Sequence, residues 1–325
     1  MIKEMSMWRT IMRENNIKTL NEAMSCGKTR YLVNLSETLH DHKYAEIANR
    51  IAEKKSVRLV LIAGPSSSGK TTSAKRLSLH MRINGLNPII ISLDDYFKNR
   101  VDTPKDANGE YDFECLEALD VPFLNQQLTQ LFAGETVEIP KYDFASGSRK
   151  FVGQTLKLGE GDILVMEGIH GLNPALTPQI PNDQKYKVYV SVLTPLRIDE
   201  KNQMSAADYR LLRRMVRDNQ FRGASPEDTI MRWPSVRNGE AKFIVPFKKN
   251  ADYQFNSALM YEMPMLKCFA EPLLQAIPAA SPAFPEAQRL LWTVRHLIAM
   301  NPTDIRHIPP ISIIREFIGG SSFTY

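Results

Sequence analysis

The sequence is poor in cysteine and has no long apolar run. Its three cysteines, Cys26, Cys115 and Cys268, are far apart and form no C-x-x-C pair, which excludes a disulfide framework and a cysteine zinc site. No stretch approaches 18 consecutive apolar residues, and the N-terminus is polar after its first turn. We therefore expect neither a membrane span nor a signal peptide, and we predict a cytoplasmic protein.

Strong charge of one sign is also missing. The 325 residues carry a formal net charge of +5, and 43% of them are hydrophobic, enough to bury a full core. A modest positive excess suits phosphate groups as well as nucleic acid. We interpret it as phosphate chemistry on a small-molecule substrate, with no membrane or nucleic-acid partner, and self-association into a homo-oligomer stays open.

The pattern of apolar residues divides the chain into three parts. Residues 1–55 contain almost no glycine or proline and read as a helical N-terminal segment. Residues 56–275 read as an α/β domain, and residues 276–325 as a C-terminal helical extension with an irregular tail. Between the second and third strands predicted below, an irregular stretch rich in turn signals is a candidate substrate-binding insertion.

Four short apolar runs predict buried parallel strands. They alternate with predicted helices, of which the first covers residues 71–84, so we expect a P-loop NTPase-type parallel sheet with helices on both faces. The four predicted strands are VRLVLIAG at 57–64, NPIIISLDD at 87–95, DILVMEG at 162–168 and KVYVSVL at 187–193.

The stretch GPSSSGKT follows the first predicted strand and opens the first predicted helix. It satisfies G-x-x-x-x-G-K-[ST], whose glycines permit a tight turn and whose backbone N–H groups bind phosphate oxygens. Lys70 is expected to reach the β- and γ-phosphates and Thr71 to ligate Mg²⁺, so we predict ATP and Mg²⁺ as ligands. The predicted nucleotide-binding residues are Gly64, Pro65, Ser66, Ser67, Ser68, Gly69, Lys70, Thr71 and Thr72.

Carboxylates close two of the predicted strands. Asp94 and Asp95 end the second strand and Glu167 ends the third, at the edge of the sheet where ligands bind in open α/β folds. We predict that Asp94 takes the proton from an attacking hydroxyl and that Glu167 orients Mg²⁺ or its water. The alternative that these residues cap neighbouring helices stays open.

Arginines crowd one predicted helix. Arg210, Arg213, Arg214 and Arg217 recur at helical spacing, and Arg222 follows shortly after. Arg210, Arg214 and Arg217 share a face that would be self-repelling unless it met anions, so we expect a clamp on the transferring phosphoryl group. For Arg213 we favour a solvated position on the basic surface. Several aromatic residues near the motifs are candidates for the wall of a ring pocket: Tyr96, Phe97, Tyr111, Phe113, Tyr142 and Phe144.

These motifs in their order resemble the uridine kinase and phosphoribulokinase family. The resemblance covers about residues 57–258 and is carried by GPSSSGKT, SLDDYF, YDF with SRK, EGI, and RLLRRMVRD followed by RG. It is closest to a long bacterial form in which the kinase follows a threonyl-tRNA-synthetase-like module, on the strength of GEYDFE, EGIHGLNP, DTIMRWPSVR and REFIGG. No such upstream module is seen, so we expect a short member of this subgroup or a shortened chain.

The resemblance implies roles for the phosphoryl-transfer residues. Asp94 corresponds to the catalytic base, and Thr71 and Glu167 correspond to Mg²⁺ ligands. We expect Asp94 to belong to the metal site as well. Arg217 and Arg222 correspond to arginines that meet phosphates. Together with Lys70, these two arginines would neutralise charge on the γ-phosphoryl group.

The resemblance also implies an acceptor site. Asp112 falls where the family binds ribose hydroxyls, Tyr142 where an aromatic ring packs on the substrate, and Arg214 where an arginine meets the sugar. Phe97 replaces a second substrate tyrosine. The implied activity is ATP-dependent phosphorylation of a nucleoside 5′-hydroxyl, as in a uridine or cytidine kinase.

The positions that would read the base depart from the family pattern. Gly147 stands in place of a histidine, Ala224 in place of an arginine and Arg232 in place of a glutamine. Two alternatives therefore stay open. One is a kinase of another small hydroxyl compound, such as a sugar phosphate or a vitamin precursor, because Arg232 would suit an anionic acceptor. The other is a non-catalytic ATP- or RNA-binding regulatory module.

Overall fold

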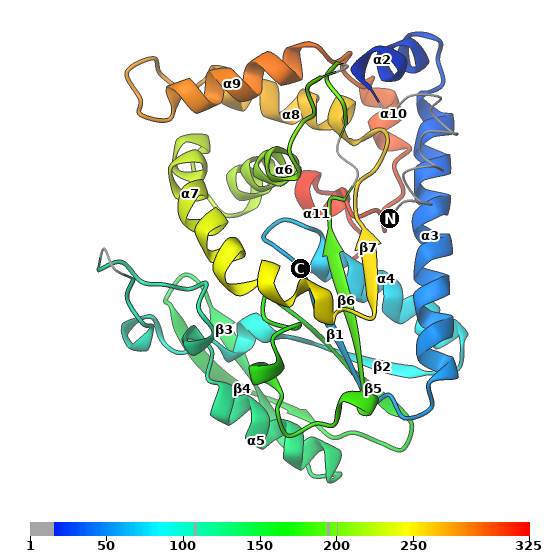
Figure 1. Ribbon diagram of the computed structural model, residues 1–325, viewed down its shortest axis with the longest axis vertical. Coiled ribbons are helices and arrows are strands. Elements are labelled where there is room, and N and C mark those ends of the chain that lie inside the picture. The colour runs from blue at the N-terminus through cyan, green and yellow to red at the C-terminus, as the bar shows by residue number, and fades with distance from the viewer. Residues whose placement is uncertain (1–15, 107–108, 194–195, 200) are drawn as a thin grey trace.

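A five-stranded parallel sheet lies at the centre of the computed structural model, which describes residues 16–106, 109–193, 196–199 and 201–325 (Figure 1). The strand order is β2-β5-β1-β6-β7, and every neighbouring pair is parallel. Two further strands form a separate antiparallel hairpin. The strands are β1 (Leu59–Ala63), β2 (Asn87–Ser92), β3 (Val137–Asp143), β4 (Ser148–Leu156), β5 (Asp162–Glu167), β6 (Lys185–Ser191) and β7 (Tyr253–Asn256).

Helices cover both faces of the sheet, which confirms the predicted α/β fold with its helical N-terminal and C-terminal additions. Among the described residues they are α2 (Ile17–Ser25), α3 (Thr29–Glu53), α4 (Lys70–Ile83), α5 (Val121–Phe132), α6 (Ala206–Phe221), α7 (Pro226–Phe243), α8 (Glu262–Gln275), α9 (Phe284–Arg295), α10 (Pro302–Arg306) and α11 (Arg315–Ile318).

The central strand shows why its sequence is apolar at every position. Val60 and Ile62 belong to a hydrophobic cluster that includes residues of α3, α4, α6 and α8. Leu59 and Leu61 belong to a second cluster with α5 and the hairpin. Successive side chains of a strand point to opposite faces, so a strand covered on both faces needs a continuous apolar run.

The N-terminal segment is tied to the P-loop helix. Helix α3 lies along α4, and the fully buried guanidinium of Arg76 in α4 donates to Glu37 (2.9 Å) and Asp41 (2.6 Å) of α3. The predicted helical character of this segment is confirmed for Ile17–Ser25 and Thr29–Glu53, which a short turn separates. The predicted helix over residues 1–15 lies outside the described residues.

The boundaries differ from the predictions around Asp94 and in the predicted insertion. Strand β2 ends at Ser92, and a 3-10 turn follows at Leu93–Tyr96, where the Ser92 hydroxyl accepts from the Asp94 N–H (3.3 Å). The stretch between β2 and β5 contains α5 and the β3–β4 hairpin, which the sequence did not predict. Strand β7, also missed, extends the sheet beside β6.

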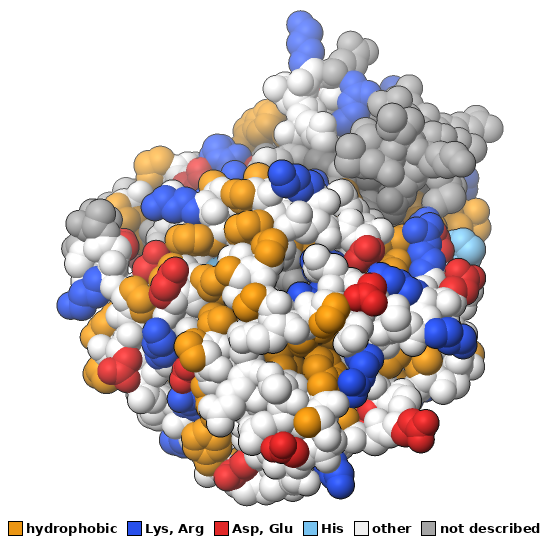
Figure 2. Space-filling view, turned by 60° about the horizontal axis from the view of Figure 1, so that its bottom comes forward, with side chains coloured by type: hydrophobic (Ala, Val, Ile, Leu, Met, Phe, Trp, Pro, Cys, Tyr) orange, Lys and Arg blue, Asp and Glu red, His pale blue; other side chains and the backbone are white. Residues whose placement is uncertain are grey.

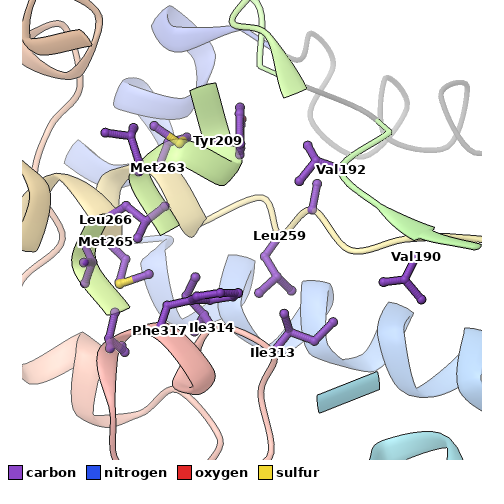
Figure 3. Packing of buried hydrophobic residues seen from close by; sticks show 14 of the residues in the cluster. Val190, Val192, Tyr209, Leu259, Met263, Met265, Leu266, Ile313, Ile314 and Phe317 are labelled. Atoms are coloured by element: carbon purple, nitrogen blue, oxygen red, sulfur yellow. The ribbon is translucent and has the colours of Figure 1, made fainter. Parts of the chain in front are cut away.

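The C-terminal tail was expected to be irregular, yet it contributes to the core. Ile313, Ile314 and Phe317 are fully buried, and Figure 3 shows them pointing towards Leu259 and Met265. Helix α11 contacts α6, so the end of the chain returns to the middle of the molecule.

No helix in the described part of the chain has the length and hydrophobicity needed to cross a bilayer. On the face shown in Figure 2, Lys and Arg side chains are interspersed with Asp and Glu, and the described residues there form no continuous basic patch.

Candidate active site

The motif at residues 64–71 forms a tight loop between β1 and α4. A Cβ atom on Gly64 would lie 2.0 Å from the Val190 carbonyl oxygen of β6, so only glycine fits there. Gly69 has φ +88° at the residue before α4, a left-handed conformation that favours glycine. Lys70 folds back so that its ammonium donates to the Pro65 carbonyl (3.3 Å).

This loop presents unsatisfied donors. The hydroxyl groups of Ser67 and Ser68 are buried, and neither has a hydrogen-bond partner among the described residues. They lie at the N-terminus of α4, where helix N–H groups and the helix dipole favour an anion. The predicted nucleotide-binding residues are thus brought together in one loop whose unpaired donors suit a phosphate.

A buried carboxylate faces this loop from β5. The Glu167 carboxylate accepts from Thr71 Oγ1 (3.0 Å) and from Ser92 Oγ (3.3 Å). Burial, followed by the nearby negative charge of Asp94, raises the pKa of Glu167 to about 7. Two close carboxylates beside a hydroxyl form an oxygen-donor set that suits Mg²⁺, because a divalent cation would offset their mutual repulsion.

Asp94 and Asp95 have different environments, although they are adjacent. The Asp95 carboxylate accepts from the Tyr142 N–H (3.0 Å) and from Lys141 Nζ (3.2 Å), so it fastens the hairpin to the turn after β2. The Asp94 carboxylate accepts no hydrogen bond within the described ranges. Burial raises its pKa, while the positive charges of Lys70, Arg222 and Arg217 oppose that shift. Asp94 is therefore the carboxylate that remains available for chemistry.

Three arginines of the predicted clamp gather around one aspartate that the sequence reasoning missed. The guanidinium nitrogens of three arginines lie close to carboxylate oxygens of Asp218. The distances are 3.2 Å for Arg214, 2.7 Å for Arg217 and 3.7 Å for Arg222. Arg214 also donates to the Ser66 hydroxyl (3.0 Å), which places it against the P-loop. Asp218 holds the three cations together, and their net charge beside Asp94 stays positive.

The other two arginines of this helix are buried and structural, which corrects two expectations. Arg213 was expected in solvent, but its side chain is completely buried and pairs with Glu262 through Nη2 (2.7 Å) and Nε (2.5 Å). Arg210 was expected on the phosphoryl clamp, but it pairs with Glu240 (2.6 Å) and donates to the Ser66 carbonyl (3.2 Å). Both side chains donate to backbone carbonyls of the P-loop and so stabilise its conformation.

Aromatic side chains line the hairpin side of the site. The ring of Phe97 lies 5.6 Å from that of Tyr142, and the rings of Phe113 and Phe144 flank this pair at 6.3 and 5.1 Å. The Tyr142 hydroxyl is buried and has no partner among the described residues, so it can serve a ligand.

A second carboxylate on this side was missed. Asp112 accepts from the Glu114 N–H (3.0 Å), so it stabilises a turn. Glu114 packs against Gly239 of α7, where an added Cβ would come within 2.5 Å of it. Burial raises the pKa of Glu114 to about 7, opposed by the positive charges of Arg214 and Lys70. The stretch YDFE contains two acidic residues, Asp112 and Glu114, and the sequence does not tell which of them faces the site. The structure shows that the turn at Asp112 brings Glu114 close to the cations of the site.

Comparison with known proteins supports the kinase interpretation. The family model described as Phosphoribulokinase / Uridine kinase family matches residues 59–262. A uridine kinase of Deinococcus deserti is 30% identical over 192 residues, covering 59% of this chain and 83% of the relative. A uridine kinase of Lactobacillus helveticus is 31% identical over 199 residues, covering 60% and 83%.

Among solved structures, a Bacillus stearothermophilus chain described as a possible uridine kinase matches with a TM-score of 0.41 at 20% identity. That match covers 65% of this chain and 97% of the other. The family match spans β1 to the start of α8 and includes the P-loop, Asp94, Glu167 and the arginines of α6. This chain belongs to the phosphoribulokinase/uridine kinase family and is an ATP-dependent kinase.

Proposed function

We propose that this kinase transfers the γ-phosphoryl group of ATP to the 5′-hydroxyl of a nucleoside. The observation that carries the proposal is the state of Asp94. Asp94 is half-buried, its carboxylate accepts no hydrogen bond in the described part of the chain, and it lies within the field of Lys70, Arg217 and Arg222. A carboxylate in that state, next to a phosphate-binding loop, suits the base for an attacking hydroxyl.

Each residue near the loop has a task in this reaction. The N–H groups at the start of α4 and the hydroxyls of Ser67 and Ser68 bind phosphate oxygens. Lys70, Arg217 and Arg222 bring positive charge to the transferring group, where electrostatic stabilisation counts most in a loose transition state. Asp94 holds the acceptor oxygen in line and receives its proton.

The residues predicted to hold Mg²⁺ are Thr71, Glu167 and Asp94. When bound, Mg²⁺ would neutralise charge on the phosphates and orient them for transfer. Burial raises the pKa of both Glu167 and Asp94, and the neighbouring negative charge of Asp94 adds to the shift of Glu167 and that of Asp95 to the shift of Asp94. A divalent cation bound here would offset this excess of negative charge.

The acceptor lies between the hairpin and α7 in this proposal. Tyr142 offers a ring face and a hydroxyl with no partner among the described residues, and Glu114 offers a carboxylate that can bind vicinal hydroxyls of a sugar. Asp112, predicted for that contact, stays a candidate two residues away. The similarity to uridine kinases supports a nucleoside as the acceptor.

A second acceptor class is favoured by Arg100. The left-handed Gly147 (φ +66°) has no side chain, and the guanidinium of Arg100 fills the space where one would be, with Nε 2.7 Å from an added Cβ. The positive charge of Arg100 lies close enough to Tyr142 to interact with it electrostatically, and Arg232 places a second positive charge near Arg214. Cations on the acceptor side would suit a phosphorylated sugar or another anionic hydroxyl compound.

Mg-ATP turnover across a panel of nucleosides, sugar phosphates and vitamin precursors tests the proposal, with the phosphorylated product identified by mass. We expect uridine or cytidine to be converted to the 5′-monophosphate. Turnover confined to anionic acceptors would replace the nucleoside by the second class, and an Arg100→Ala variant should then lose that preference. Release of inorganic phosphate alone would contradict both.

A further inference from the structure

The C-terminal tail reaches the nucleotide loop from the far end of the sequence. An added Cβ on Gly69 would lie 2.7 Å from Ile313 Cγ2, so the tail packs directly on the P-loop. Three residues later, the Glu316 carboxylate accepts from the N–H (3.3 Å) and the hydroxyl (2.7 Å) of Thr72. The residues 312–325 lie outside the segment that the family model matches, so this contact is not part of the matched kinase domain.

The position of Thr72 in α4 shows why its contact with Glu316 concerns the phosphate site. Thr72 is in the first turn of α4, where N–H groups have no partner within the helix and bind anions. The bound anion here is a carboxylate of the same chain. The negative charge of Glu316 also acts on Lys75, one turn further along α4.

The last residues of the chain add to the contact. Thr72 Oγ1 donates to Glu316, so the Tyr325 hydroxyl, 2.9 Å away, donates to Thr72 Oγ1. Lys75 donates to the Thr324 carbonyl, and its ammonium lies 4.7 Å from the centre of the Tyr325 ring. The end of the chain therefore covers the start of α4.

The residues around Glu316 are anchored in the core, whereas two glycines follow before the last five residues of the chain. Phe317 is fully buried, 5.2 Å below the guanidinium of Arg213, and Figure 3 shows it seated with Ile313 and Ile314 in the core. Gly319 and Gly320 follow with φ +85° and +71°. Two glycines in the left-handed region permit a change of direction that would let residues 321–325 move while α11 stays in place.

We propose that the C-terminal tail is part of the nucleotide site, and that Glu316 occupies a phosphate position on Thr72 until nucleotide displaces it. This inference rests on the proposed binding of nucleotide at the P-loop, and it adds a competitor built into the chain. A phosphate and a carboxylate cannot share one N–H group, and their charges repel each other. Nucleotide binding therefore turns Glu316 away and releases residues 321–325 from α4.

Titration of ADP in the presence of Mg²⁺, measured by calorimetry, tests the competition without any acceptor. If Glu316 holds Thr72 in roughly 90% of molecules, it weakens apparent affinity about tenfold, so Glu316→Gln should bind ADP about threefold to tenfold more tightly. Glu286→Gln, on the exposed side of α9, serves as the matched control and should bind as the wild type does. Unchanged or weaker binding by Glu316→Gln would overturn the inference.

Hydrogen exchange gives a second, independent readout. In the wild type, ADP should speed amide exchange in residues 321–325 and leave α11 protected. Tyr325→Phe, which keeps the ring and loses the hydroxyl contact to Thr72, should show faster exchange there before ADP is added. Slower exchange of residues 321–325 on ADP binding would instead show that the tail closes over the nucleotide, and would contradict displacement. Both readouts need ADP alone, so failure to find an acceptor does not affect them.

Discussion

The buried charges of this protein are of two kinds, and their partners tell them apart. Arg213 and Glu262 form an ion pair with no exposed surface on either side chain, and the remaining guanidinium donors of Arg213 bond to Ser257 and to P-loop carbonyls. Glu167 is buried and Asp94 and Glu114 are half-buried, none of them has an ion-pair partner among the described residues, and desolvation raises the pKa of each. Paired charges support the loop, whereas unpaired ones mark the positions where a ligand would supply the missing interaction.

Removal of Arg213 should strongly destabilise the fold. Arg213→Ala leaves Glu262 buried without its partner, and breaking such a pair costs about 3–5 kcal/mol in the free energy of unfolding. Urea denaturation measures this difference. Arg237→Ala is the control, because Arg237 is about half exposed and lies 3.8 Å from Glu240, and it should cost less than about 1 kcal/mol. Equal effects of the two substitutions would contradict the structural role of Arg213.

Glu114 should make stability fall as the pH rises. Its pKa is raised from 4.5 to about 7 in the folded protein, so the folded state binds this proton more tightly than the unfolded chain does. The cost of ionising Glu114 is absent below about pH 4.5, grows up to about pH 7, and is complete above it.

Glu114→Gln removes that cost, so the variant should equal the wild type in stability near pH 4.5 and exceed it at pH 8. Thermal unfolding at both pH values measures this. The neighbouring and exposed Glu117→Gln should show no such pH-dependent gain. A Glu114→Gln gain that is the same at both pH values would contradict the raised pKa.

At the scale of elements, the sequence predicted those parts whose signal is local. The four predicted strands coincide with β1, β2, β5 and β6 to within about three residues at each end, because strands buried on both faces are apolar throughout. Strand β4 was missed because most of its residues are exposed, so it has no apolar pattern. Strand β7 has only four residues and depends on β6 for its pairing.

The same reasoning explains which site residues could be predicted from the sequence and which could not. The P-loop, Asp94 and Glu167 each follow a strand, and parallel strands bring their carboxyl ends to one edge. The burial of Arg213 depends on Glu262, 49 residues further on, and helical spacing alone does not reveal which face of α6 is covered. Glu114 likewise depends on its packing against α7.

Loosening the β3–β4 hairpin should weaken the binding of the acceptor and leave the binding of the nucleotide unchanged. Asp95→Ala leaves the buried Tyr142 N–H without an acceptor and loosens β3 from the turn after β2. A loss of about 1–3 kcal/mol in positioning corresponds to an acceptor KM raised about fivefold to 150-fold, while the dissociation constant for ADP stays within about twofold. Steady-state kinetics and ADP titration test this split. The exposed Asp102→Ala is the control, and a matching loss of ADP affinity in Asp95→Ala would contradict the assignment.

At the scale of the whole molecule, the three predicted segments share one core. A single hydrophobic cluster includes Ile47 of α3, Val60 of β1 and Leu290 of α9. The ion pairs of Arg76 with α3, and the seating of Phe317 under Arg213, add polar and cationic links between the segments. The division at residues 55 and 275 stays a prediction about sequence organisation, and the packing favours joint folding.

The described chain should therefore unfold in one cooperative transition. Scanning calorimetry should give a calorimetric enthalpy equal to the van't Hoff enthalpy, because loss of either terminal segment exposes the same core. Two separated transitions would contradict a shared core, and would favour independent terminal domains.

The proton acceptor is the central claim, and a single-turnover measurement with Asp94→Asn tests it most directly. Wild-type and variant enzyme are mixed with Mg-ATP and the acceptor from the panel, and ADP affinity is measured in parallel, with the exposed Asp183→Asn as control. Asp94→Asn should slow phosphoryl transfer about 10²–10⁴-fold and leave ADP affinity within about threefold, because asparagine keeps the shape but cannot take the proton. Transfer at the wild-type rate in Asp94→Asn would show that another group accepts the proton.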